Sequence, residues 1–291
     1  MHSDVINPLV DQSGNAVTIK YFLLTEEISI EEVCNAVNAV KKDKASGVDN
    51  IPADVFCNRT CVLILHELFN RCFRTGLVPD VWNNIIINPI PKSNMSDNKD
   101  PRCYRGIALA PAAYKLYCRL LSGRLSQWID DNNGLAEEQN GFRKWRSTVD
   151  QIAYLTNIIY VLKKLHKSTF CALIDYKKTH DTIDRHLLWG KLTSLGVDTK
   201  MCLAIKLLYN GVTCSVRLNS FNTDRFFVNC GLKQQCPLSP LLFNIFINEL
   251  TVYLKSFDLG IYIGGEKACI LLYAEDIALL TNTENDLHYR F

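Results

Sequence analysis

The sequence predicts a fold that mixes helices with short strands, and three observations support this prediction. Segments with apolar residues three and four positions apart recur through the first 168 residues, which is typical of amphipathic helices. Short apolar runs become frequent after Thr169. Two of these runs, 268–273 and 277–280, are separated by only a few residues, which predicts a hairpin.

The size and composition of the chain indicate a folded protein without a membrane span. Its 291 residues are 48% hydrophobic and 21% charged, which suits one large domain or two modest ones. No apolar run reaches the roughly 18–20 residues of a membrane helix, and residues 1–20 lack a signal-peptide pattern. We therefore expect an intracellular protein of the nucleus or cytoplasm, neither secreted nor bound in a membrane.

The 12 cysteines do not predict a disulfide framework, because they are scattered through apolar segments of a long chain. One group, Cys57, Cys61, His66 and Cys72, resembles a zinc knuckle in its residue types. The segment 62–72 has the apolar spacing of an amphipathic helix, however, whereas a knuckle needs tight turns there. Buried thiols on a helix are the favoured interpretation.

In the first half of the chain, Ser29 and Glu32 form a capping-box pattern that opens a helix with an apolar face at 33, 36, 37 and 40. That helix is expected to close within 41–47. Three further helices are expected over 61–75, 112–131 and 149–166. A strand is expected over 82–90, and a polar loop over 91–104.

The second half has more strands. A strand is predicted over 169–175, then helices over 187–195 and 201–209, then paired strands over 213–218 and 225–230. Ser239 and Pro240 suit the cap and first position of a helix that continues to 254. The tight turn Ala274-Glu275-Asp276 joins the last two strands.

Three carboxylates are expected to lie close together on two neighbouring strands. Asp175 ends one apolar strand, and Glu275 and Asp276 form the tip of the apolar hairpin. Carboxylates beside such strands are costly unless they are solvated, paired or bound to metal. Three of them suit two Mg²⁺ ions about 3.5–4 Å apart, as in phosphoryl transfer. The alternative interpretation is that each acid only marks a turn.

The net charge of +2 gives no overall signature of nucleic-acid binding. The distribution is uneven, since 71–124 holds nine Lys or Arg residues and three Asp residues. This stretch either lines a phosphate-binding groove or forms a solvated face.

Two sets of three segments carry a family resemblance. The later set is Ala172-Leu-Ile-Asp-Tyr-Lys-Lys-Thr-His-Asp-Thr-Ile-Asp184, Gly231-Leu-Lys-Gln-Gln-Cys-Pro-Leu-Ser-Pro-Leu-Leu-Phe-Asn244 and Tyr273-Ala-Glu-Asp276. The earlier set is Lys44-Ala-Ser-Gly-Val-Asp-Asn-Ile-Pro52, Tyr104-Arg-Gly-Ile107, and Gly141-Phe-Arg143 with Arg146-Ser-Thr148. The later set resembles the palm motifs, and the earlier set the fingers blocks, of the reverse transcriptases of LINE-type (non-LTR) retrotransposons. The segments follow one another in the family's order.

The resemblance implies a right-hand polymerase with an α+β palm, whose antiparallel sheet is backed by helices, and with largely helical fingers. The expected division is an N-terminal flank over 1–28, fingers with the first palm elements over 29–168, and palm over 169–291. A thumb, an endonuclease and an RNase H are expected to be absent, as parts of a longer polyprotein. The expected partners are an RNA template, a DNA primer and deoxynucleoside triphosphates.

The resemblance also implies roles for particular residues. Asp175, Glu275 and Asp276, helped by the backbone carbonyl of Tyr176, would bind two Mg²⁺ ions, for which Mn²⁺ substitutes. Lys92 and Arg105 would bind the triphosphate. His180 would stand where the family excludes the ribose 2′-hydroxyl, Gln234 and Gln235 would lie under nucleotide and template, and Arg143 and Arg146 would bind nucleic acid.

The chain departs from the family at four of its motif positions. Glu275 stands for an aspartate, Gln235 for a glycine, His180 for Phe or Tyr, and Thr179 for an alanine. The sequence therefore predicts one of two functions: a reverse transcriptase acting by two-metal nucleotidyl transfer, or a catalytically decayed fragment that keeps the fold and weak nucleic-acid binding.

Overall fold

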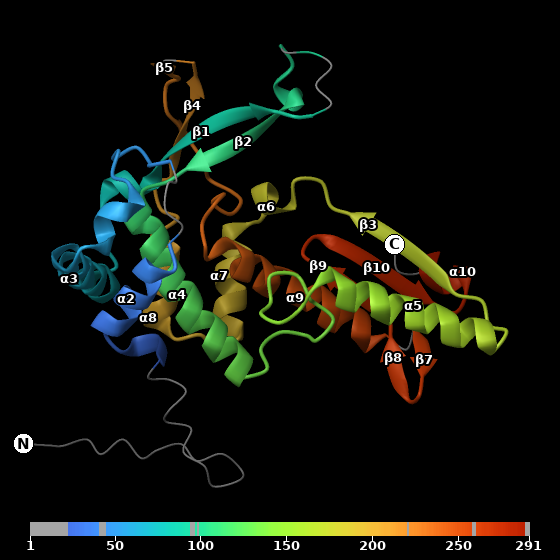
Figure 1. Ribbon diagram of the computed structural model, residues 1–291. Coiled ribbons are helices and arrows are strands. Elements are labelled where there is room, and N and C mark those ends of the chain that lie inside the picture. The colour runs from blue at the N-terminus through green and yellow to red at the C-terminus, as the bar shows by residue number, and fades with distance from the viewer. Residues whose placement is uncertain are drawn as a thin grey trace, which may run out of the picture. The chain divides into compact units, whose positions relative to one another are not determined.

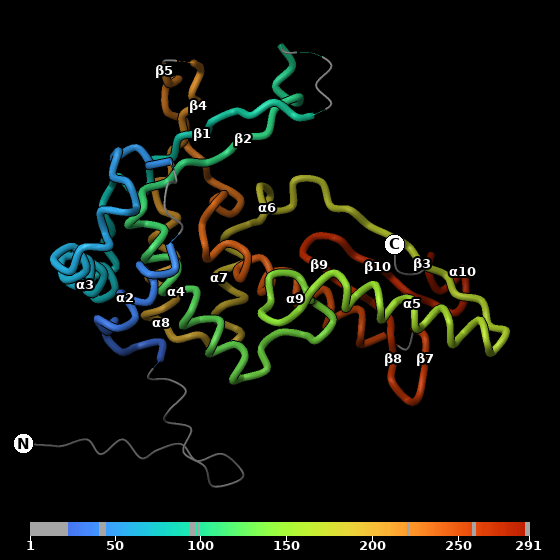
Figure 2. Tube along the Cα trace, viewed as in Figure 1, coloured from blue at the N-terminus to red at the C-terminus, as the bar shows by residue number. Residues whose placement is uncertain are grey.

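The computed structural model describes residues 23–40, 45–93, 97, 99–219, 221–257 and 260–288 (Figures 1 and 2). Most of the predicted flank 1–28, and Lys44 of the first fingers block, lie outside the described residues. The chain folds into two compact units. Unit 1 comprises residues 1–132, 192–229 and 233–239, and unit 2 comprises 133–191, 230–232 and 240–291. The predicted limits of fingers and palm stay a prediction.

The main helices described in unit 1 have ends that follow local signals in the sequence. The capping box of Ser29 and Glu32 is confirmed, with Ser29 Oγ accepting from Glu32 N and Glu32 Oε2 accepting from Ser29 N. Asn58 caps the second helix, which ends at the left-handed Gly76. The helices are α2 (Ile30–Asn38), α3 (Arg59–Thr75), α4 (Ala112–Asp131) and α8 (Thr199–Leu207).

The core of unit 1 is an aromatic cluster between helices. The ring of Phe69 on α3 lies 5.4 Å from that of Tyr117 on α4, and Trp82 lies 5.6 Å from Tyr117 and 6.2 Å from Tyr114. Such packing stabilises the unit beyond the burial of apolar area alone. Cys61, His66 and Cys72 all lie on the continuous helix α3, so the predicted helix is confirmed over this segment.

The sheet of unit 1 joins strands that are far apart in sequence. Its order is β2-β1-β4-β5, with β6 also on β4; β1 and β2 are antiparallel and β1 and β4 are parallel. The prediction of a loop reaching 104 missed strand β2, and the predicted strand 225–230 shrinks to two residues. The strands are β1 (Asn84–Pro91), β2 (Tyr104–Leu109), β4 (Thr213–Leu218), β5 (Phe221–Asn222) and β6 (Phe226–Phe227). Short 3₁₀ turns are η1 (Ala53–Cys57), η2 (Asp80–Asn83) and η3 (Pro101–Cys103).

Unit 2 is built on an antiparallel three-stranded sheet of order β3-β10-β9. Helix α5 contacts β9, and α10 contacts β3 and β10. The sheet strands are β3 (Phe170–Asp175), β9 (Ile270–Tyr273) and β10 (Asp276–Thr281), beside the small hairpin of β7 (Ile261–Ile263) and β8 (Glu266–Ala268). The helices are α5 (Thr148–Lys164), α6 (Thr179–Thr182), α7 (Arg185–Ser194, whose last residues belong to unit 1), α9 (Ser239–Ser256, whose first residue belongs to unit 1) and α10 (Glu284–His288).

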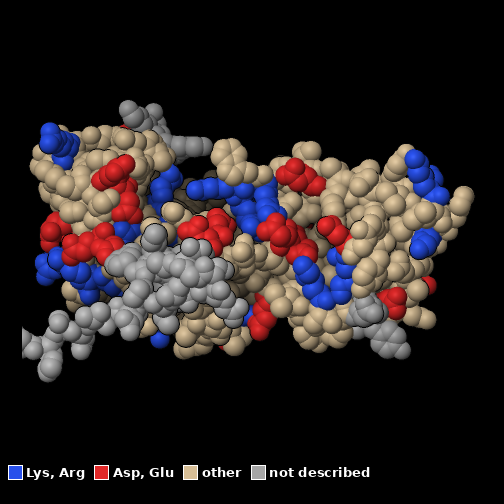
Figure 3. Space-filling model, turned by 90° about the horizontal axis from the view of Figure 1, so that it is seen from below, with Lys and Arg blue, Asp and Glu red and all other residues tan. Residues whose placement is uncertain are grey.

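The basic stretch 71–124 is not a uniform phosphate-binding face. Arg124 has a side chain only 5% exposed and forms an ion pair with Glu32, so the expectation of a phosphate contact is wrong for this residue. Arg102 pairs with Asp100. On the face shown in Figure 3, acidic and basic side chains are interspersed. No helix in the described ranges is long and apolar enough to cross a membrane.

Candidate active site

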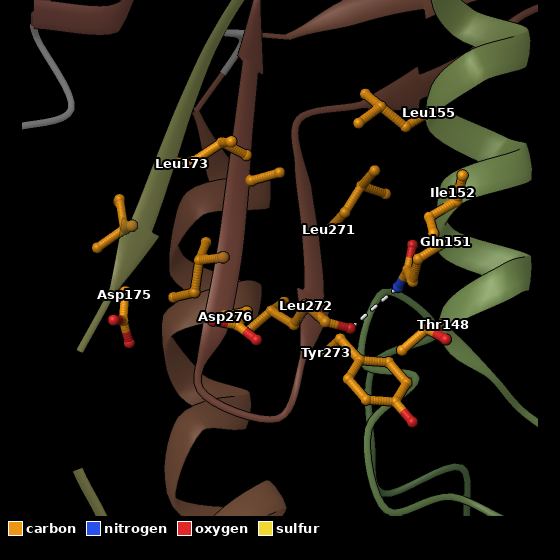
Figure 4. A pocket seen from close by; sticks show the side chains of 13 residues that line it. Thr148, Gln151, Ile152, Leu155, Leu173, Asp175, Leu271, Leu272, Tyr273 and Asp276 are labelled. Carbon is orange, nitrogen blue, oxygen red and sulfur yellow. Dashed lines mark hydrogen bonds between the residues drawn. The ribbon is translucent and has the colours of Figure 1, made fainter. Parts of the chain in front are cut away.

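The strand register of unit 2 brings two of the predicted carboxylates together. Asp276, the first residue of β10, is the direct cross-strand partner of Asp175, the last residue of β3. Opposed residues on antiparallel strands have Cβ atoms about 4.5–5.5 Å apart and share a face of the sheet. Both side chains are exposed at the same end of the sheet (Figure 4). Glu275 precedes Asp276 in the turn and is half-buried.

An apolar cavity of about 400 Å³ opens beside this pair (Figure 4). It lies between helix α5 and the sheet, and its walls include Ile152, Leu155, Leu173 and Leu271. Asp175 and Asp276 line the same cavity. The two carboxylates therefore stand where a solvated surface meets an apolar wall.

The backbone carbonyl of Tyr176, predicted to help bind metal, already has a hydrogen-bond donor. Thr179 Oγ1 donates to this carbonyl at 2.9 Å. The alanine that the family has at this position could not make that bond. A carbonyl oxygen has two lone pairs, so the hydroxyl competes for the acceptor without closing it.

His180 is packed among aromatic rings of unit 2. Its ring stacks on Phe243 of α9 at 4.5 Å between centroids and meets Phe142 edge-on at 6.0 Å. The His180 carbonyl accepts a hydrogen bond from Leu232 N at 2.7 Å, which joins the first and second palm motifs. His180 thus keeps the aromatic packing expected of the Phe or Tyr that it replaces.

The two predicted triphosphate ligands come together in unit 1. Lys92 follows β1 and Arg105 lies on β2, and both line a cavity of about 510 Å³ with Ile90, Ser93 and Ile107. The antiparallel ribbon of β1 and β2 (Figure 2) sets this arrangement, since Arg105 is the partner of Ile90. Lys92 Nζ donates to the Arg102 carbonyl at 2.7 Å, and both predicted cations are exposed.

The turn with Gln234 and Gln235 lies in unit 1, and both side chains are exposed. Gln235 has a φ of 57°, in the left-handed region where glycine is favoured. The glycine that the family has here therefore suits the backbone conformation of the turn as well as close approach to a ligand. Gln235 lines a pocket with Pro237, Ala110 and Lys115.

Beneath this turn is a buried polar group that holds it in place. The buried ammonium of Lys233 donates to Asn83 Oδ1 at 3.1 Å and lies 4.6 Å from the Tyr114 ring centre. Burial raises the pKa of the Cys236 thiol, but the neighbouring Cys118 and Tyr114 side chains and the charge of Lys233 outweigh burial and bring this pKa to about 6. The hydroxyl of Ser239 donates to the Lys233 carbonyl at 2.7 Å. Ser239 is itself the first helical residue, so its predicted role as a cap is wrong.

Arg143 and Arg146, predicted to bind nucleic acid, make hydrogen bonds inside their own loop. Arg143 donates to the Ala136 carbonyl at 3.0 Å, and Arg146 donates to the Glu137 carbonyl at 2.8 Å and pairs with the Glu137 carboxylate. The cations lower the pKa of the Glu137 carboxyl, first through the hydrogen bond from Arg146 and against the effect of burial. These contacts order the loop before helix α5.

Two residues of this region escaped the sequence analysis. Gln139 hydrogen-bonds both backbone groups of Ala274 in the carboxylate hairpin. Arg185 donates to the Gly231 carbonyl at 2.8 Å and to the Cys230 carbonyl at 3.0 Å, which fixes the start of the second palm motif. The only local signal for Gln139 was its place two residues before the motif glycine Gly141.

The donor set at the carboxylates fits a divalent cation. Asp175 and Asp276 offer the oxygen ligands that Mg²⁺ prefers. Across the described residues, no group of three or more His, Cys, Asp or Glu side chains could hold a metal ion. The predicted role of Glu275 as a third ligand stays a prediction.

The model of the reverse transcriptase (RNA-dependent DNA polymerase) family matches residues 90–290. The chain belongs to this family. The match begins at the β1–β2 ribbon and continues past the carboxylate hairpin, so it includes every predicted site residue. Enzymes of this family generally use divalent metal ions.

The relatives of this chain place its reverse transcriptase domain with those of the non-LTR retrotransposons. It is 28% identical over 263 residues to a probable RNA-directed DNA polymerase from transposon BS of Drosophila melanogaster, covering 87% of this chain and 28% of the relative. It is 26% identical over 270 residues to the RNA-directed DNA polymerase from mobile element jockey of Drosophila funebris, covering 90% and 28%. The chain thus spans less than a third of the length of these relatives.

Solved structures show the same fold. Apo telomerase from Candida tropicalis matches with a TM-score of 0.51 and 14% identity, over 78% of this chain and 50% of that chain. A telomerase complex with a telomeric RNA fragment, from the same organism, matches with a TM-score of 0.53 and 14% identity, over 77% and 41%. The predicted α+β polymerase fold is confirmed.

Proposed function

We propose that this chain carries the nucleotidyl-transfer site of a non-LTR retrotransposon reverse transcriptase. Its substrates are an RNA template, a DNA primer and deoxynucleoside triphosphates, and its metal is Mg²⁺, with Mn²⁺ as a substitute. The observation that carries the proposal is the cross-strand pairing of Asp175 with Asp276 within the matched reverse transcriptase domain.

Some of the predicted residues bind the charged metal ions and triphosphate, and others shape the site. Asp175, Asp276 and Glu275 hold divalent ions, which stabilise the attacking and leaving oxygens of phosphoryl transfer when bound. Lys92 and Arg105 bind the triphosphate through charge-assisted hydrogen bonds. These two cations line one cavity of the β1–β2 ribbon, which supports their common role.

The remaining predicted residues select and support the nucleotide and the strands. His180, held by Phe243 and Phe142, presents a fixed wall for the ribose 2′ position. Gln234 and Gln235 lie beneath nucleotide and template. Arg143 and Arg146 contribute to nucleic-acid binding in two ways: they order their own loop, and their positive charge attracts phosphates.

A second function is favoured by three local observations: a decayed copy that keeps the fold and binds nucleic acid weakly. Glu275 does not complete a group of three ligands in the described part of the chain. Thr179 occupies the Tyr176 carbonyl. Gln235 holds a backbone conformation that favours glycine.

Primer extension on an RNA template, with Mg²⁺ and with Mn²⁺, tests the first function and separates it from the second. The protein is compared with Asp175→Asn and with the matched control Asp181→Asn, an exposed acid of α6. Extension by the parent and the control, lost in Asp175→Asn, supports the enzyme. A parent that does not extend a primer, yet binds RNA–DNA hybrid with an affinity that falls steeply with salt, supports the remnant. Extension that survives in Asp175→Asn contradicts the assigned site.

A further inference from the structure

The turn that carries the hairpin carboxylates begins with a strained residue. Ala274 has a φ of 55° and is buried. The left-handed conformation is unfavourable for an ordinary residue, because Cβ crowds the following carbonyl. Contacts from outside the hairpin must therefore hold this turn, and the position of Glu275 and Asp276 depends on them.

The side chain of Gln139 makes those contacts. It is 2% exposed; its Oε1 accepts from Ala274 N at 3.0 Å and its Nε2 donates to the Ala274 carbonyl at 3.2 Å. The same Oε1 accepts from Gly141 N at 2.8 Å. Two N–H groups meet at one atom, so only the amide oxygen fits there, and the orientation of the amide is determined.

The loop that carries Gln139 is itself anchored against the hairpin. A Cβ added to Gly141 would stand 2.0 Å from Ala274 N and 2.7 Å from its Cα, so no other residue allows this approach. On the other side, Asn244 of α9 donates to the Gly141 carbonyl at 2.8 Å. The loop therefore brings Gln139 to Ala274 at a fixed distance.

Strand β9 is held by hydrogen bonds that do not involve the Gln139 side chain. A change at Gln139 should therefore affect the turn without releasing the strand. Leu272 N donates to the Glu138 carbonyl and Asn140 N donates to the Leu272 carbonyl, each at 3.0 Å. Gln151 of α5 donates to these two carbonyls, at 2.8 Å to Glu138 and 3.0 Å to Leu272 (Figure 4). Within the described part of the chain, Gln139 is the residue whose side chain hydrogen-bonds Ala274.

We propose that Gln139 is a positioning residue: it holds Ala274 in the left-handed turn and so sets where the carboxylates of Glu275 and Asp276 stand. The consequence for metal binding rests on the function proposed above, whereas the effect on the turn does not. Loss of a residue that orients metal ligands typically costs on the order of 10–100-fold in metal affinity. Gln139→Met keeps the length of the side chain and removes the amide, and is expected to weaken Mn²⁺ binding by about that factor.

Two readouts are measured on the full chain: Mn²⁺ affinity by electron paramagnetic resonance, and hydrogen exchange of the amides of Ala274 and Glu275. Gln151→Met is the matched control, because it removes a half-buried amide that bonds β9 and not the turn. We expect Gln139→Met to lose Mn²⁺ affinity and hairpin protection, and Gln151→Met to keep both. Gln139→Glu retains an oxygen for both N–H groups and should fall between the parent and Gln139→Met.

The outcomes separate this inference from the proposed function. If the parent binds no Mn²⁺, the metal function fails, and the exchange data alone decide the role of Gln139. Unchanged hairpin exchange in Gln139→Met overturns the inference. Equal losses of affinity in Gln139→Met and Gln151→Met also overturn it, because they would show general destabilisation rather than positioning.

Discussion

Replacing Gln235 with glycine should stabilise the protein, although the substitution removes a whole side chain. Gln235 is exposed, and its φ of 57° lies in the left-handed region. Its side chain is not needed to bury apolar surface. The removal of backbone strain is therefore expected to raise the free energy of unfolding by more than the lost side-chain contacts lower it.

The magnitude follows from two opposed effects. A non-glycine residue in this conformation costs about 1–2 kcal/mol, and glycine loses roughly 0.5–1 kcal/mol more backbone freedom on folding than alanine does. The difference predicts a gain of about 0.5–1 kcal/mol for Gln235→Gly. For domains of this size, that corresponds to a rise in the unfolding midpoint of roughly 1–4 °C.

Gln234 offers a matched control, because it is an exposed glutamine in the same turn but does not have a positive φ. Gln234→Gly is therefore expected to lose stability, by up to about 1 kcal/mol. Urea unfolding followed by circular dichroism measures both variants against the parent. If Gln235→Gly is no more stable than Gln234→Gly, the strain at Gln235 is not what the backbone geometry indicates.

Three further outcomes are expected. Thr179→Ala should free the Tyr176 carbonyl and tighten Mn²⁺ binding, while Thr179→Ser should not; equal affinities in a Mn²⁺ titration would contradict the competition. Burial alone would raise the pKa of the Glu32 carboxyl, but the hydrogen bonds from Arg124 and Ser29 and the charge of Arg124 outweigh it, so this pKa is lowered. A lowered folded pKa gives stability that is present above the ordinary value of 4.5 and lost as pH falls through the folded pKa, so urea midpoints should drop below about pH 4.5 by more in the parent than in Glu32→Gln. Glu275→Asp shortens the side chain by one bond, about 1.5 Å, and should raise the rate of Mn²⁺-dependent primer extension by on the order of a hundredfold. An unchanged rate would show that the length of the Glu275 side chain does not limit activity.

Elements with strong local signals could be predicted from the sequence. Helix α4 and strand β4 have the predicted limits, 112–131 and 213–218, because periodicity and flanking residues define them locally. The hairpin of β9 and β10 follows from two apolar runs around a short turn. The pairing of Asp175 with Asp276 then follows once both strands enter one sheet.

Features that depend on distant partners could not be predicted. Strand β2 has only a weak pattern of its own and exists through its ladder with β1. Gln139 hydrogen-bonds Ala274, 135 residues away, and no pattern near Gln139 in the sequence indicates that partner. The competition at the Tyr176 carbonyl likewise depends on how the chain turns into α6, which residue types alone do not specify.

The central claim is that Asp175 and Asp276 form a divalent-metal site in this reverse transcriptase domain. A titration with Mn²⁺, followed by electron paramagnetic resonance with Mg²⁺ as competitor, tests it directly on the parent, Asp175→Asn, Asp276→Asn and the control Asp181→Asn. The account predicts Mg²⁺-competed binding in the parent and the control, and its loss in the other two variants. Binding of equal strength in all four proteins would contradict it.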